Sequence, residues 1–68
     1  MTRTEPELWQ IAEQVLTDKQ LEACRLVWQR QLTVGQAAAI LQIDRSAVRD
    51  RLRSATRNLA TALRKDAA

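Results

Sequence analysis

The sequence contains no histidine, phenylalanine or tyrosine, and only one cysteine, one glycine and one proline among its 68 residues. Without histidine the usual pairing of a nucleophile with a general base is missing, and the lone Cys24 can form neither an internal disulfide nor a cysteine-rich metal site. The scarcity of glycine and proline leaves few turns, which favours helices over a sheet of many strands. We therefore expect an all-α chain that is not an enzyme and takes no cofactor or metal.

Long apolar runs are also missing. No run approaches the roughly 18 residues that a membrane-spanning helix requires, and no signal peptide is recognisable. A single cysteine is typical of a reducing compartment. These absences predict a cytoplasmic protein without a membrane partner. The length allows one small domain, residues 1–68, that buries only about 60% of the surface exposed by its unfolded chain.

Positive charge is scarce in the first part of the chain and abundant in the second. Residues 1–43 carry four basic and five acidic side chains, whereas residues 44–68 carry seven basic and three acidic ones, a net charge of +4. This asymmetry favours a partner with dense negative charge, such as double-stranded DNA. The alternative interpretation is an ordinary solvated helix face.

Helix starts are marked by a repeated pattern, Thr-x-x-Glu/Gln, at Thr4–Glu7, Thr17–Gln20 and Thr33–Gln36. In such a capping box the threonine hydroxyl accepts from an amide of the first helical turn, and the Glu or Gln side chain accepts from the threonine amide. A fourth helix opens at Asp44, or at Ile43 with Asp44 just inside it. Together with apolar residues at helical spacing, these starts predict helices at about residues 5–15, 18–31, 34–41 and 45–64.

The core is expected to contain both tryptophans. Trp9 and Trp28 occupy apolar helical positions, and a domain this small needs large side chains at its centre, so we assign both to the core rather than to base stacking. Cys24 is assigned to the core as a small apolar residue.

Residues 33–52 predict two short helices with a tight break between them. Ala38 lies where the helices would touch, and Val48 and Leu52 lie one turn apart on a single face of the second helix. A small residue at a crossing, an apolar anchor and a basic outer face are the requirements of a helix-turn-helix. Thr33, with the amides that open the first of these helices, could hold a phosphate. The candidate DNA-binding residues are Thr33, Arg45, Ser46, Arg49, Asp50, Arg53 and Arg57.

The expected roles of these residues depend on their place along the last helix. Arg45 and Arg49 can bond bidentately to guanine, and Asp50 can accept from the amino group of cytosine. Arg53 and Arg57 lie farther along and are expected at phosphates, which position a protein without specifying a sequence. The alternative interpretation is that the arginines only provide solubility, and that Asp50 repels phosphate.

Short motifs carry a resemblance to a known family. They are Leu16-Thr17 with Gln20, Leu26, Leu32-Thr33, Ala38, Leu41, Ile43, Ser46, Val48, Arg51-Leu52, Ala55 and Leu59. From Leu16 onward the chain resembles region four of bacterial sigma factors, the domain that recognises an upstream promoter element. The resemblance implies a four-helix domain with a C-terminal helix-turn-helix, whose last helix enters the major groove of DNA to regulate transcription. Because 68 residues cannot also contain the region with which a sigma factor holds polymerase, the chain is either an excised domain or a free-standing protein, and the capped helix start at Thr4 favours the free-standing protein. A homodimer or a tether to RNA polymerase would strengthen the weak binding of one copy.

Two departures from the family leave a second function open. The family usually places glycine in the turn before the recognition helix and at the end of the second helix, where this chain has Gln42 and Gln31. A non-glycine residue with φ > 0 is uncommon, so these turns are expected either to rearrange or to carry strain. Sigma region four also docks on the flap of the RNA polymerase β subunit. The alternative function is therefore a protein-interaction module that modulates promoter use without strong DNA binding of its own, which Gln42 and Asp50 favour.

Overall fold

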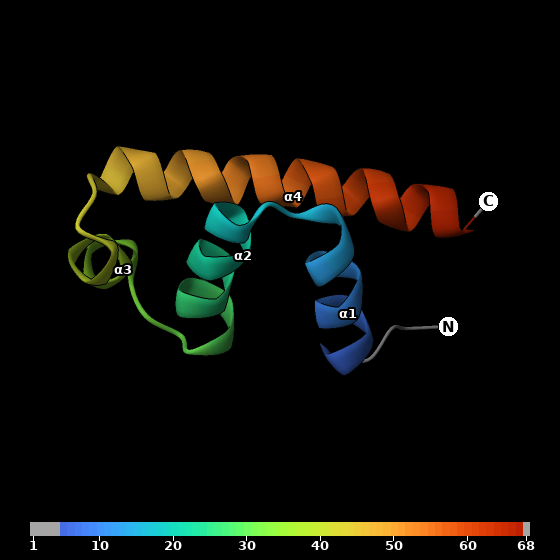
Figure 1. Cartoon of the computed structure of the whole chain (residues 1–68), viewed down its shortest axis with the longest axis horizontal. Helices are drawn as coiled ribbons and strands as arrows, with labels where there is room; N and C mark the ends of the chain where they lie inside the picture. Colours follow the sequence, from blue (N-terminus) through green and yellow to red (C-terminus); the bar gives the residue numbers. More distant parts are fainter. Residues whose placement is uncertain (1–4, 68) are drawn as a thin grey trace.

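The computed structural model describes residues 5–67, which are helical apart from short connections (Figure 1). The elements are α1 (Glu5–Val15), α2 (Asp18–Cys24), the π-helical turn η1 (Arg25–Gln29), α3 (Val34–Leu41) and α4 (Arg45–Ala67). The predicted all-α, four-helix fold is confirmed, because η1 continues α2 without a break. The second helix ends at Gln29 rather than 31, and α4 extends past the predicted 64. Within residues 5–67, no helix has the length and apolar character needed to cross a membrane.

Helix α4 is the element on which the others assemble. Its 23 residues span about 34 Å at 1.5 Å per residue, close to the 38 Å length of the whole molecule. Helices α3, α2 and α1 all contact the same side of α4, in that order from its N-terminal to its C-terminal end (Figure 1). Helices α1 and α2 lie side by side below α4, with a gap between their backbones. Arg25 Nη2 of η1 donates to Glu13 Oε1 of α1 at 2.7 Å and so links α1 to the second helix.

Two of the three predicted capping boxes are confirmed. Thr17 Oγ1 accepts from the Gln20 amide at 3.2 Å, and Gln20 Oε1 accepts from the Thr17 amide at 3.2 Å. The same exchange joins Thr33 and Gln36, with distances of 3.1 and 2.9 Å. Each box satisfies two amides that a helix start would otherwise leave without a partner. The predicted box at Thr4 lies outside the described residues.

The two glutamines that replace family glycines adopt the left-handed conformation, with φ of 59° at Gln31 and 58° at Gln42. In both turns the next residue returns a hydrogen bond to the helix: Leu32 donates to the carbonyl of Leu26 at 3.0 Å, and Ile43 donates to that of Ala38 at 3.1 Å. The turns therefore keep the geometry that glycine favours. Each costs on the order of 1 kcal/mol, because a Cβ crowds the following carbonyl there.

The core consists mainly of small side chains in two clusters. One contains Ala12, Leu16, Cys24 and Ala55, and the other contains Leu26, Ala37, Ala38 and Val48. Leu52 of α4 packs against both clusters. Cys24 is fully buried as predicted, and this burial raises the pKa of its thiol to about 11. Alanines at these contacts let the helices approach α4 closely.

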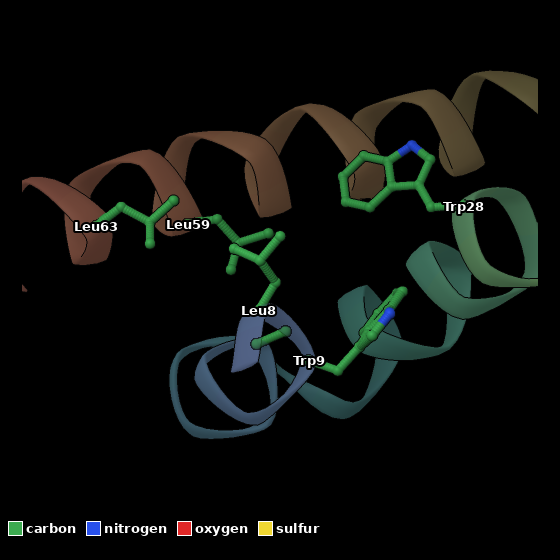
Figure 2. A pocket seen from close by; sticks show the side chains of 6 residues that line it. Leu8, Trp9, Trp28, Leu59 and Leu63 are labelled. Atoms are coloured by element: carbon green, nitrogen blue, oxygen red, sulfur yellow. The ribbon is translucent and has the colours of Figure 1, made fainter. Parts of the chain in front are cut away.

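The assignment of both tryptophans to the core is wrong for Trp28, which is 41% exposed. Trp9 is partly buried and packs against the first cluster. The physical reason lies in the arrangement of the helices. Helices α1 and α2 lie apart beneath α4 (Figure 1), and the side chain of Trp28, on η1, borders an apolar pocket between them (Figure 2). Alanine, leucine and valine fill the interior in its place.

Candidate nucleic-acid interface

The helix-turn-helix is formed by α3, the turn at residues 42–44 and the start of α4. Ala37 and Ala38 on α3 pack with Val48 on α4, and both Ala37 and Val48 are fully buried. The small residue predicted at the crossing is therefore found there. Since Val48 is anchored in the core, the side of α4 opposite to it faces solvent in the first turns.

This outward side of α4 presents a row of exposed polar residues, the reading face, formed by Ser46, Arg49, Asp50 and Arg53. Their spacing of three, four and seven residues places them on one side of the helix. Arg57 is also exposed but lies eight residues beyond Arg49, about 12 Å along the axis. The row contains four of the five residues expected on this face from the sequence, all but Arg45, and Arg57 lies at its far end.

Asp50 forms an ion pair with Arg53 on the reading face. Asp50 Oδ1 lies 4.0 Å from Arg53 Nη1, and both side chains are 74% exposed. A pair so open to water contributes little to stability, roughly 0–1 kcal/mol, and is screened by salt. Its main consequence is electrostatic, because Asp50 partly neutralises the arginine one turn beyond it.

Arg45 is separated from the other arginines of the surface. Its guanidinium lies against Gly35 in the first turn of α3: a Cβ on Gly35 would lie 3.1 Å from Arg45 Nε and 3.3 Å from Nη2. The side chain therefore turns back from α4 across the start of α3. Sequence reasoning grouped Arg45 with Arg49 and missed this role of Gly35, for which the sequence pattern gives no signal.

The start of α3 combines this guanidinium with the amides of a helix N-terminus. Thr33 Oγ1 already accepts from the Gln36 amide, so its acceptor capacity serves the helix while its O–H can still donate. Amides of the first turn carry partial positive charge, and Arg45 adds a full one beside them. This end of the helix-turn-helix is therefore electropositive without using the side chains of the reading face.

Charge is divided between the two sides of the molecule. Helix α4 carries seven basic and two acidic residues, a net charge of +5, whereas residues 5–29 carry two basic and five acidic residues, a net charge of −3. A polyanion is therefore attracted to α4 and repelled from the opposite side. Among residues 5–67, no group of three His, Cys, Asp or Glu side chains is placed to hold a metal ion.

Comparison with known proteins identifies one family. The profile of the helix-turn-helix proteins described as YlxM / p13 like matches residues 2–65, nearly the whole chain. No curated protein and no solved structure gives a significant match.

Proposed function

Since the chain belongs to the YlxM / p13 like family of helix-turn-helix proteins, we propose that it is a small DNA-binding regulator of transcription with α4 in the major groove. The observation that carries this proposal is the exposed reading face of α4, held outward by the burial of Val48. The proposed role is binding rather than catalysis. A protein acting on chromosomal DNA in this way would work in the cytoplasm of a bacterial cell.

In this proposal Arg49 contacts a base. It lies in the middle of the reading face, and arginine bonds bidentately to the O6 and N7 atoms of guanine. Ser46 contributes a permissive contact one turn earlier. Asp50 lowers the affinity for any phosphate but can accept from the amino group of cytosine, so it exchanges affinity for selectivity.

The remaining contacts are to the DNA backbone. Arg45 and the amides that open α3 form one phosphate site, supported by the guanidinium over Gly35. Arg53 and Arg57 lie farther along α4 and would reach other phosphates. Three arginine–phosphate contacts predict that the logarithm of the binding constant falls with the logarithm of salt concentration with a slope of about −3.

The test is a titration of duplex DNA at several salt concentrations with the wild type and two variants. Arg49→Ala should weaken binding to a selected sequence by roughly 1–3 kcal/mol while leaving binding to random duplex much less changed. Lys19→Ala removes an exposed positive charge from α2, outside the helix-turn-helix, and is the matched control. An affinity that is indifferent to salt, or absent at low salt, would contradict the proposal.

A second candidate function is docking on the flap of the RNA polymerase β subunit. Two observations favour it: Asp50 partly neutralises the reading face, and Ile40 on α3 is 54% exposed although it is a large apolar residue. Purified polymerase should then be retained by the immobilised chain. Retention that survives Arg49→Ala but is lost in Ile40→Gln supports docking, and no retention counts against it.

A further inference from the structure

An apolar groove lies on the side of the molecule away from the helix-turn-helix. It lies between α1 and η1 and is bounded on a third side by the C-terminal half of α4 (Figure 2). Its volume is about 270 Å³, and its lining residues are Leu8, Trp9, Ala12, Trp28, Leu59 and Leu63. Leu8 and Trp28 are 38% and 41% exposed. The two largest side chains of the protein thus border a space that residues 5–67 do not fill.

The groove does not have the character of a small-molecule site. Ligand cavities in proteins usually enclose about 300–1,000 Å³ and place a few polar groups to orient the ligand. This space is smaller, and each of its lining residues is aliphatic or aromatic. It is shaped to take apolar side chains of another protein surface, and tryptophans at the centre of such a surface commonly dominate binding.

Charge around the groove identifies the occupant as a second copy of this chain. Helix α1 carries three acidic residues and no basic one, and Glu13 among them is paired with Arg25 of the same chain, whereas the last turn of α4 carries Arg64 and Lys65. Exposed charges adjoin the apolar edges, because Glu7 precedes Leu8 and Arg64 follows Leu63. A two-fold axis through the groove would place the acidic α1 of each copy against the basic end of its partner's α4, and the same patch would serve both sides.

We propose that this groove is the interface of a homodimer. The small core gives the reason for it: alanines fill much of the interior, a domain of this size buries little apolar surface, and Trp28 remains 41% exposed. Burial of Trp28 and Leu8 in the interface supplies the apolar area that the isolated fold lacks.

The proposed dimer leaves the helix-turn-helix free. Arg49 lies about 18 Å along the α4 axis from the middle of the segment between Leu59 and Leu63, so the interface does not cover the reading face. Dimerisation is independent of the DNA-binding proposal, and its tests contain no DNA.

The first test is sedimentation equilibrium of the whole chain from low-micromolar to near-millimolar concentration. We expect a monomer–dimer equilibrium that Trp28→Gln weakens by at least about 30-fold, the effect of losing a central hot spot. Ile40→Gln is the matched control, because it removes an apolar residue that is more exposed but lies on α3, and it should leave the equilibrium unchanged. Circular dichroism of each variant verifies that the helices remain.

The second test exchanges charges and leaves the apolar residues intact. Glu7→Lys alone and Arg64→Glu alone should each weaken the dimer several-fold, and the double variant should restore it, because the opposite charges face each other again across the two-fold axis. A wild-type chain that stays monomeric overturns the proposal and leaves the groove to a different protein. A dimer that is sensitive to Ile40→Gln but not to Trp28→Gln, or a double variant without rescue, overturns this interface.

Discussion

The two ends of α4 carry regions of opposite character. At its N-terminal end the helix-turn-helix is closed: Ala37 and Val48 are fully buried there, and α4 directs polar side chains outward. At its C-terminal end α1 and η1 leave an open groove bordered by the half-exposed Trp28. One helix therefore serves a region that is complete within one chain and a region that exposes apolar surface.

Because of this difference, the size of a side chain does not by itself determine how much it contributes to the stability of the fold. In the closed region a small valine is surrounded on all sides and cannot be lost without leaving a void. In the open region the side chain of Trp28 contributes less to the stability of a single chain than a fully buried tryptophan would, because water already reaches much of it. The closed region should therefore determine the stability of the monomer, and the open region its association.

The largest expected effect is on the free energy of unfolding of a variant in the closed region, and its absence would contradict this comparison of the two regions. Val48→Ala should lower the free energy of unfolding by about 2–3 kcal/mol, because two buried carbons are removed and the cavity cannot collapse. Trp28→Ala should cost about 2 kcal/mol despite the larger deletion, when measured in dilute solution where association is negligible, because 41% of the residue is already exposed and its loss leaves an open space rather than a closed cavity. Urea unfolding followed by circular dichroism gives both values. A larger loss for Trp28→Ala would show that the groove is part of the core.

A pH effect of similar size tests whether the interior behind the groove is dry. Burial raises the pKa of the Cys24 thiol to about 11 from an ordinary value near 9.0, so the unfolded chain ionises first as pH rises. The stability that comes from the neutral thiol is complete below pH 9 and is lost up to about pH 11, on the order of 2–3 kcal/mol in all. Unfolding free energies between pH 8 and 11 should fall more steeply for the wild type than for Cys24→Ala. Parallel slopes would mean that water reaches the thiol.

The same contrast explains what could be predicted from the sequence. Helix starts at Thr17 and Thr33 depend on side chains within one turn, so capping boxes located them. The Ala38–Val48 crossing was predictable because a helix-turn-helix is compact and local in sequence. The angle between α1 and the second helix depends on long-range packing, and no local pattern encodes it. For this reason Trp28 was misplaced.

One part of the candidate site could likewise be predicted from the sequence, and another part could not. Helical periodicity placed Arg49 and Asp50 on one exposed face, because they follow a well-anchored residue on the same helix. The contact of Arg45 with Gly35 joins residues ten apart on two helices, and it depends on the conformation of a long flexible side chain. Periodicity contains no information on such a contact.

A smaller effect on the free energy of unfolding is expected at the two turns whose glutamines have positive φ. Gln42→Gly should raise the free energy of unfolding by up to about 1 kcal/mol, because glycine accepts a φ of 58° without the crowding of a Cβ. Gln31→Gly should do the same at the end of η1, where φ is 59°. The matched control is Gln29→Gly, a helical glutamine of η1, which should instead lose about 1 kcal/mol. If Gln42→Gly destabilises, the side chain of Gln42 makes a contribution that its backbone geometry does not reveal.

The smallest expected change in stability, at Gly35, separates folding from DNA binding within the closed region. Gly35→Ala should stabilise α3 by about 0.5 kcal/mol, because alanine is the better helix former and the exposed Arg45 side chain can move by the few tenths of an ångström that the new Cβ requires. That movement displaces the guanidinium from the start of α3, so DNA affinity should fall several-fold while stability rises. In an Arg45→Ala background the same change should leave DNA affinity unaltered, since there is no guanidinium to displace. Ala39→Gly, at an exposed position of α3 away from this contact, calibrates the helix effect and should destabilise without changing the role of Arg45. Equal loss of affinity in both backgrounds would place the effect of Gly35 in the backbone of α3 rather than in the position of Arg45.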